Sequence, residues 1–154
     1  MEVKKRHYLS KKDIKNIKKE LSFIELPKKN VELAVTDKYE LILVENEPVA
    51  FKYEDKIIPT LKALSKVEID KGFAIVDMGA IKHLINGADV MAPGIVDADE
   101  DIKEGDVVIV LDEKNKKPIC VGIALMSGEE MKRENKGKAI KNIHYVGDDI
   151  WNFK

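Results

Sequence analysis

The sequence contains few of the residues on which disulfides, membrane spans and export signals depend. Cys120 is the only cysteine among the 154 residues, so neither an internal disulfide nor a metal site with several thiolate ligands can form. The longest apolar runs, at 107–111 and 119–126, are much shorter than the roughly 20 residues that span a bilayer. The lysine-rich segment 1–10 also lacks the apolar centre of an export signal. We therefore expect a globular cytoplasmic protein in which Cys120 is a buried, unreactive residue.

Motifs that carry catalysis or nucleotide binding are also missing. Ser127 lacks the glycine two residues earlier that a nucleophile elbow requires. No Gly-Lys-Ser or Gly-Lys-Thr is present to form a Walker-type phosphate loop, and no GxGxxG is present to bind a dinucleotide. We therefore expect no catalytic residues and no cofactor.

A metal site is not expected either. The three histidines, His7, His83 and His144, lie more than 50 residues apart, so no helix or hairpin presents a local pair of zinc ligands. The acidic segment 97–101 has aspartates at the first, third and fifth positions of a would-be calcium loop. Ile102 and Val108 then stand where that loop needs glycine and glutamate. The segment is predicted to be a charged turn.

Charge is balanced over the whole chain but not along it. The formal net charge is −1, from 27 basic and 28 acidic side chains. Residues 1–72 carry 16 basic and 13 acidic side chains, whereas residues 73–154 carry 11 basic and 15 acidic ones. The second half is therefore not drawn to a polyanion by its overall charge, while the basic excess within residues 1–19 is suited to phosphate.

The first half is predicted to contain one amphipathic helix and a small sheet. Ser10 can cap a helix that extends to Pro27, with apolar residues at three- and four-residue spacing. The polar face of this helix carries Lys11, Lys15 and Lys18, which form either a solvated surface or a set of phosphate contacts. Strands are expected at 31–36, 40–45 and 48–53, and Pro59 can open a short helix.

The second half is predicted to begin after Gly72, which divides the chain into domains 1–72 and 73–154. Asp77 can cap a helix that ends at Asn86 and Gly87. Ser127 can cap a second helix, and Trp151 is expected to pack the end of the chain. Strands are expected at 73–76, 90–96, 107–111, 119–126 and 138–146. These elements indicate an α+β protein.

Several segments of the second half resemble a PUA domain. The run 76–94 looks like the opening helix and turn of such a domain, and 105–108, 120–122 and 126–127 match its strands. More narrowly, 135–145 resembles the malignant T-cell-amplified sequence family and its archaeal relatives. Asp148 and Trp151 also fit that family, and 58–64 is similar to part of the small domain that precedes its PUA domain. The resemblance implies a small α+β pre-PUA domain followed by a PUA-type mixed β pseudobarrel with short helices.

The same resemblance implies a non-catalytic RNA-binding protein that acts in translation initiation, reinitiation or ribosome recycling. In that family the targets are small-subunit rRNA and the tRNA acceptor end, and a density-regulated-protein-like factor is a possible partner. Two alternatives stay open. The chain is an accessory RNA-binding subunit of a tRNA- or rRNA-modifying enzyme, or it is an adaptor that binds proteins and no longer contacts RNA.

The resemblance also implies where RNA binds. The expected groove lies between the first helix of the PUA domain, the glycine turn after it, the next strand and the last strand. Its residues here are Lys82, Asn86, Gly87, Ala88, Asp89, Val90, Met91, His144 and Tyr145. Gly87 would let RNA approach main-chain amides, and Val90 and Met91 would pack against a base. His144 and Tyr145 either contact a base or pack within the fold, and His83 is expected at the plain surface.

Overall fold

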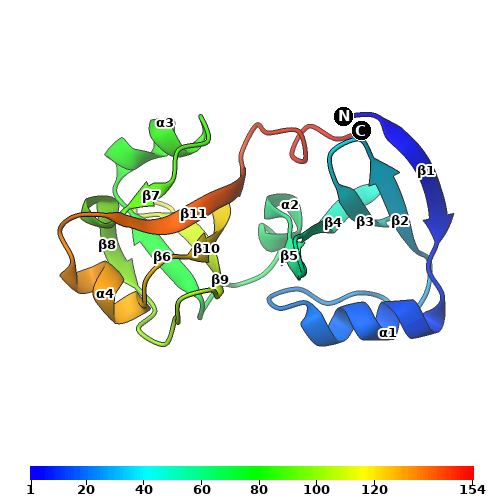
Figure 1. Ribbon diagram of the computed structural model, residues 1–154, viewed down its shortest axis with the longest axis horizontal. Coiled ribbons are helices and arrows are strands. Elements are labelled where there is room, and N and C mark those ends of the chain that lie inside the picture. Colours follow the sequence, from blue (N-terminus) through cyan, green and yellow to red (C-terminus); the bar gives the residue numbers. More distant parts are fainter. The chain divides into compact units, whose positions relative to one another are not determined.

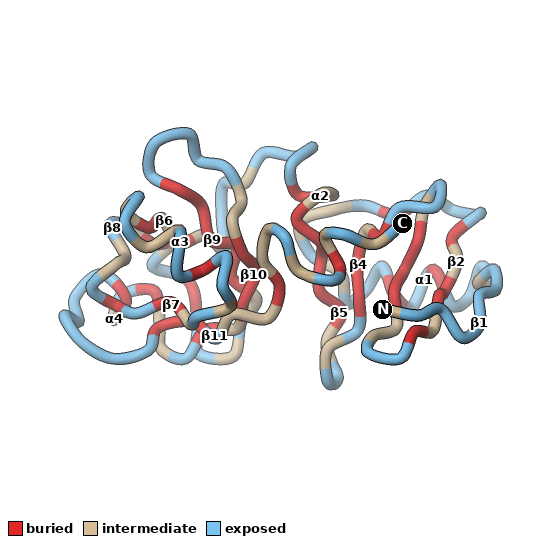
Figure 2. Tube along the Cα trace, turned by 90° about the horizontal axis from the view of Figure 1, so that it is seen from above, coloured by how far each residue is buried: buried red, intermediate tan, exposed pale blue.

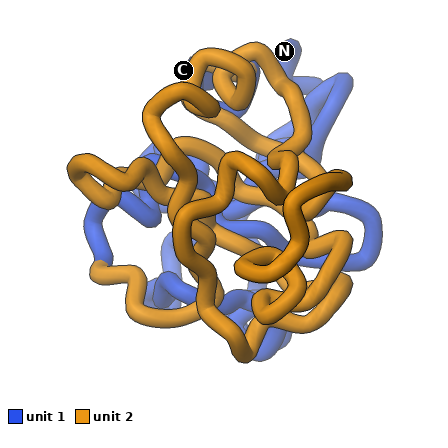
Figure 3. The backbone as a smooth tube through the Cα atoms, turned by 90° about the vertical axis from the view of Figure 1, so that its left-hand side faces the viewer, with its two compact units in different colours: residues 1–67, 149–154 blue, residues 68–148 orange.

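The computed structural model describes residues 1–154, and the chain forms two compact units. The first unit consists of Met1–Val67 together with Asp149–Lys154, and the second of Glu68–Asp148 (Figure 3). The backbone therefore passes between the units twice, so that the C-terminal segment belongs to the unit that also contains the N-terminus.

The first unit is built on an antiparallel sheet of five strands in chain order (Figure 1). Its strands are β1 (Val3–Tyr8), β2 (Val31–Thr36), β3 (Glu40–Val44), β4 (Glu47–Tyr53) and β5 (Lys56–Pro59). The expected three-strand meander corresponds to β2, β3 and β4. The edge strands β1 and β5 were not expected. Pro59 ends β5, so the short helix that was expected through Leu61 and Leu64 begins after this proline. Ile57 and Ile58 are buried where β5 pairs with β4, which favours extended backbone at this proline.

Two helices complete the first unit. The helix α1 (Lys11–Glu20) is capped as expected, because the Ser10 hydroxyl accepts a hydrogen bond from the Asp13 N–H at 3.1 Å. It ends at Glu20 instead of continuing to Pro27, because the next residue, Leu21, is already extended with a ψ of 123°. Phe23 then adopts a φ of 76°, which a right-handed helix cannot contain. The short helix α2 (Leu61–Leu64) follows Thr60, whose side chain caps it.

The C-terminal segment packs as part of the first unit. Ile150 is buried, and the Lys62 ammonium lies 5.0 Å from the centre of the Trp151 ring. Asp149 forms an ion pair with Lys38 at 2.5 Å. Trp151 thus packs the end of the chain, but it does so within the first unit.

The second unit contains a mixed sheet of six strands in the order β7-β11-β10-β9-β6-β8 (Figure 1). Only β6 and β9 are parallel neighbours. The strands are β6 (Phe73–Val76), β7 (Val90–Met91), β8 (Ile95–Ala98), β9 (Val107–Asp112), β10 (Pro118–Ala124) and β11 (Lys138–Tyr145). The single strand expected at 90–96 is divided into β7 and β8, because Pro93 lies within the 3-10 turn η2 (Ala92–Gly94).

Short helices connect the strands of this pseudobarrel. Asp77 caps the 3-10 turn η1 (Met78–Ala80), which leads into α3 (Ile81–Leu84), and Ser127 caps α4 (Gly128–Arg133). The core includes residues of β6, β9, β10 and β11, and most residues of β9 and β10 are buried (Figure 2). Cys120 is fully buried in it, and this burial raises the pKa of its thiol above the ordinary range. No helix is long and apolar enough to cross a membrane.

Candidate nucleic-acid interface

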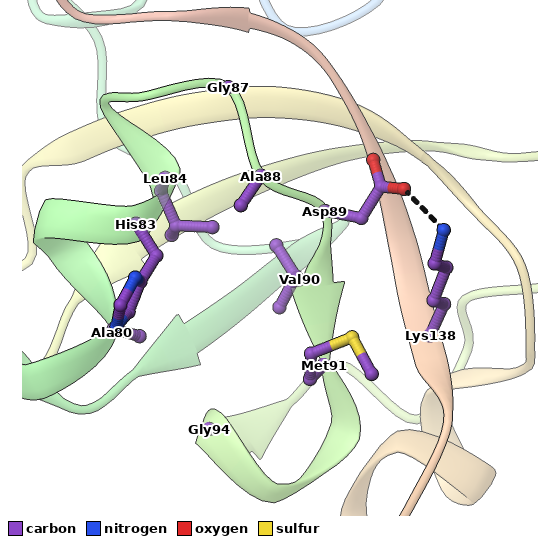
Figure 4. Close-up of a pocket in the computed structure, with 10 residues that line it drawn as sticks. All are labelled: Ala80, His83, Leu84, Gly87, Ala88, Asp89, Val90, Met91, Gly94 and Lys138. Carbon is purple, nitrogen blue, oxygen red and sulfur yellow. Dashed lines mark ion pairs between the residues drawn. The ribbon is translucent and has the colours of Figure 1, made fainter.

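A groove of about 550 Å³ lies where α3, the turn after it, β7 and the start of β11 meet (Figure 4). Its lining residues are Ala80, His83, Leu84, Gly87, Ala88, Asp89, Val90, Met91, Gly94 and Lys138. The exposed side chain of His83 stands at one side of the groove, and Asp89 and Lys138 meet at the other. The lining thus joins segments that are about fifty residues apart in sequence.

The turn after α3 is a tightly hydrogen-bonded helix end. The Gly87 N–H donates to the Leu84 carbonyl at 3.0 Å, and the Ala88 N–H donates to the His83 carbonyl at 3.0 Å. Gly87 has a φ of 91°, which only glycine adopts without strain. A Cβ at this position would contact the Tyr145 hydroxyl at 3.4 Å. The N–H groups of Gly87 and Ala88 are therefore already engaged, so they are not free to donate to an RNA that approaches the main chain at this turn.

Asn142 of β11 holds this turn in place from the other side. Its side-chain amide donates to the Leu84 carbonyl at 3.0 Å and to the Ala88 carbonyl at 2.9 Å. Its main-chain N–H donates to Asp89 Oδ1 at 2.9 Å. Sequence reasoning missed this residue, because its two acceptors lie more than fifty residues earlier in the chain.

The groove contains one ion pair between its own lining residues. Asp89 Oδ2 lies 3.3 Å from Lys138 Nζ, and the side chains are 26% and 63% exposed respectively. Met91, which pairs with Lys138 across β7 and β11, is 46% exposed. An apolar contact and a cation are thus placed beside each other, a combination that suits a base and its phosphate.

The predicted groove residues fall into two groups. Gly87, Ala88, Asp89 and Met91 line the groove and are at least partly exposed, and their contact with RNA stays a prediction. Lys82 and Asn86 are exposed but do not line it, and Asn86 instead donates to the Lys82 carbonyl at 2.9 Å. Val90 borders the groove, yet its side chain is buried in the core. The prediction that Val90 packs against a base was therefore wrong, and its side chain supports the groove from below.

The structure also changes the roles expected for His144, Tyr145 and His83. His144 is fully buried, and its Nδ1 lies 2.8 Å from Asp148 Oδ2. The interpretation of His144 as a base contact was therefore wrong, because no face of the ring is open to a nucleotide. Tyr145 packs under the turn at Gly87 and does not line the groove. His83, which was expected at the plain surface, does line it.

The lysines of α1 belong to the first unit. Lys11, Lys15 and Lys18 are exposed on the helix, and its apolar side buries Ile14 and Ile17. They share a solvent-facing surface, as the sequence predicts. Their use as a phosphate anchor stays a prediction.

Comparison with known families matches both halves of the chain. Residues 72–146 match the model of the PUA domain, and residues 5–67 match a domain of unknown function, DUF1947. The chain is a PUA-domain protein with DUF1947 ahead of that domain. Its PUA domain contains the whole groove, from Ala80 to Lys138.

Several curated proteins are similar in sequence to this chain across both matched domains. An uncharacterized protein of Methanocaldococcus jannaschii is 68% identical, with 100% of this chain and 99% of that protein covered. Translation machinery-associated protein 20 of Saccharomyces cerevisiae is 36% identical over 83% of this chain and 75% of its own length. Malignant T-cell-amplified sequence 1 of Rattus norvegicus is 34% identical over 75% of this chain and 65% of its own length. The resemblance drawn from the sequence is thus confirmed.

Solved structures agree with the fold. The crystal structure of a hypothetical protein from Pyrococcus horikoshii has a TM-score of 0.86 and 47% identity, covering 96% of this chain and 98% of that one. A conserved PUA domain protein from Thermoplasma acidophilum has a TM-score of 0.84 and 32% identity, covering 97% and 100%. The pairing of a PUA domain with this N-terminal domain is therefore shared by the relatives.

Neither domain contains a cluster of side chains suited to bind a metal ion. No group of three or more histidine, cysteine, aspartate or glutamate side chains is placed to hold a metal ion. Within segment 97–101, Asp99 stabilises the local structure instead. Asp99 accepts hydrogen bonds from the Gly72 N–H at 2.6 Å and the Asp101 N–H at 2.9 Å.

Proposed function

We propose that this protein is a non-catalytic RNA-binding factor of the cytoplasmic translation machinery, and that its PUA groove holds an unpaired RNA end. The observation that carries the proposal is the juxtaposition of Met91 and Lys138 beside an open groove of about 550 Å³. The tRNA acceptor end and small-subunit rRNA are the proposed targets, and a density-regulated-protein-like factor is a proposed partner.

The relatives support the translation part of the proposal. Similarity to translation machinery-associated protein 20 extends over 83% of this chain, so it includes residues of both matched domains. PUA domains are RNA-binding modules, which supports RNA as the ligand of the second unit. The combination favours a factor that works on ribosomal or transfer RNA.

The charge of the second half and the residues that line the groove both favour recognition of an unpaired RNA end over recognition of a duplex. Residues 73–154 carry 11 basic and 15 acidic side chains, so a broad phosphate footprint would be repelled. The groove offers instead an exposed methionine, a histidine and one lysine. A base that is already unpaired can enter such a site without the cost of unstacking a helix.

The test compares two RNAs that differ only in their 3′ end. One ends in single-stranded CCA, and in the other this end is closed by a complementary strand. We expect the open end to bind at least about tenfold more tightly, because only an unpaired base can pack against Met91 and stack on the ring of His83. Stacking of a base on an aromatic ring is worth about 1–3 kcal/mol. Equal binding of both RNAs would contradict end recognition.

A pair of glutamate variants locates the binding in the groove. Met91→Glu places a carboxylate in the groove and is expected to weaken binding of the open end by more than about tenfold. Val96→Glu adds the same charge to another exposed apolar strand residue that does not line the groove, and its affinity should match the wild type. Circular dichroism melts check that both variants fold.

The translation role is tested separately by sedimentation of cell extracts. Co-sedimentation with small ribosomal subunits, lost in Met91→Glu and kept in Val96→Glu, is the expected result. Stoichiometric capture of an RNA-modifying enzyme would favour the accessory-subunit alternative. Capture of a protein partner with no RNA crosslink would favour the adaptor alternative.

A further inference from the structure

The groove has a single permanently charged cation among its lining residues. This is Lys138, because the other basic lining side chain is His83 and the main-chain amides at 87 and 88 are already hydrogen-bonded. Any phosphate held inside the groove must therefore be held mainly by Lys138. This step rests on the proposed function, in which the groove holds an RNA end.

Lys138 is already paired before any ligand binds. Its Nζ lies 3.3 Å from Asp89 Oδ2 (Figure 4). Asp89 is itself fixed, because its other oxygen accepts the Asn142 N–H at 2.9 Å. The carboxylate is thus the stationary partner, while Lys138 is the longer and more exposed side chain, with 63% of its surface open.

The strand register places Lys138 beside the apolar contact. Met91 and Lys138 are cross-strand partners of β7 and β11. Directly opposed residues of antiparallel strands have Cβ atoms about 5 Å apart. A nucleotide whose base packs on Met91 therefore brings its own phosphodiester within reach of the Lys138 ammonium.

We propose that Asp89 is a built-in competitor for the RNA phosphate, and that Lys138 exchanges Asp89 for that phosphate when an RNA end binds. The exchange makes the phosphate contact conditional. A nucleotide that does not place its phosphate at Lys138 leaves the Asp89–Lys138 ion pair intact, and the Asp89 carboxylate then repels its phosphate. Asp89 thus lowers affinity for anions in general and favours a ligand that fills the groove in one orientation.

Two substitutions test whether Asp89 competes with the RNA phosphate for Lys138 or only holds Lys138 in position. Asp89→Asn keeps an oxygen to accept the Asn142 N–H but removes the charge that holds Lys138. It should therefore tighten binding of the RNA with the open CCA end about two- to fivefold, the range that corresponds to an exposed ion pair. Lys138→Met should weaken binding about fivefold at 0.1 M salt and make the slope of log affinity against log salt shallower by about 0.7.

Matched controls come from a second ion pair of the same unit. Lys132 lies 3.5 Å from Asp97 and 2.9 Å from Glu100, and none of the three lines the groove. Lys132→Met and Asp97→Asn make the same charge changes elsewhere, so they should leave affinity and salt slope unchanged. Thermal melts of all four variants verify folding.

The outcomes distinguish the exchange from the groove itself. If Lys138→Met behaves like Lys132→Met while Met91→Glu still abolishes binding, the groove binds RNA but the exchange is refuted. If Asp89→Asn weakens binding, the carboxylate orients Lys138 and does not compete with the phosphate, which also overturns the proposal. If the wild type binds neither RNA, the proposed function fails, and the exchange fails with it.

Discussion

At the scale of single residues, Asn142 shapes the groove without lining it. Its two N–H groups satisfy carbonyls of Leu84 and Ala88, which lie more than fifty residues earlier in the chain. The amide oxygen is buried and has no hydrogen-bond partner. The reverse orientation would direct that oxygen at two carbonyl oxygens, so the amide acts here as a donor only. This side chain therefore ties the turn to β11, in addition to the main-chain hydrogen bonds within the turn.

Replacing Asn142 by aspartate tests this dependence. Asn142→Asp removes both donated hydrogen bonds and turns a carboxylate oxygen toward the Leu84 and Ala88 carbonyls. The Leu84 carbonyl keeps its bond from the Gly87 N–H, so we expect a total cost of about 1–3 kcal/mol. We expect a lower free energy of unfolding in urea and weaker binding of the open RNA end. Asn135→Asp, at an exposed position, is the control and should change neither. Unfolding curves that coincide for the two variants would refute the donor role.

At the scale of elements, caps define where the short helices of the second unit begin. In α4 the Ser127 hydroxyl accepts the Glu130 N–H at 3.1 Å, and the Glu130 carboxylate accepts the Ser127 N–H at 3.0 Å. Hydrogen bonding from the Ser127 N–H, and then from its side chain, lowers the pKa of Glu130 from its usual value. The reciprocal pair explains how six residues form a stable helix.

The lowered pKa of Glu130 predicts a pH dependence of stability. The carboxylate stabilises the folded state fully above the unfolded pKa of a glutamate, about 4.3. This contribution is lost as the pH falls through the lower pKa of the folded state. The stability difference between wild type and Glu130→Gln should therefore shrink as the pH is lowered from 7 toward 3, measured by urea unfolding. Glu129→Gln, one residue earlier in the same first turn, is the control. A constant difference across this range would argue against the cap.

At the scale of the whole molecule, the return of the chain to the first unit is the main organising feature. Residues 149–154 belong to the first unit although they follow the last strand of the second. Buried Ile150 and the contact of Lys62 with Trp151 secure them there. The stability of the first unit thus depends on residues from both ends of the chain.

Truncation of Ile150 should affect the two units differently. Ile150→Ala removes a buried side chain, which costs about 2–5 kcal/mol. We expect amide hydrogen exchange to accelerate in β2, β3 and β4 more than in β9 and β10, because the lost contacts belong to the first unit. Lys154→Ala, at an exposed position of the same segment, should leave exchange unchanged. An equal loss of protection in both sheets would contradict this assignment.

Local pattern predicted much of the fold. The strands β2, β3, β4, β6, β9, β10 and β11 follow from alternating or continuous apolar residues between turn signals, and Ser10, Asp77 and Ser127 cap helices as expected. The strand β1 was missed because all six of its side chains are exposed, so no apolar pattern marks it. Its existence depends on pairing with β2, a contact that local sequence does not encode.

The groove was predicted from the resemblance, but its chemistry was not. Met91 and Asp89 were expected from the family pattern, while Lys138 and Asn142 come from a strand about fifty residues away. Burial decided the role of His144, which reads in the sequence like an aromatic available to a base.

The amino-acid sequence by itself determined the local elements, the helix caps and the family, because these depend on residues within a few positions of one another. Only the tertiary structure decided which main-chain amides at the glycine turn are already hydrogen-bonded, which cation lines the groove and which unit contains the C-terminus. Those properties depend on hydrogen bonds, ion pairs and burial between segments that are distant along the chain, and folding alone brings such segments together.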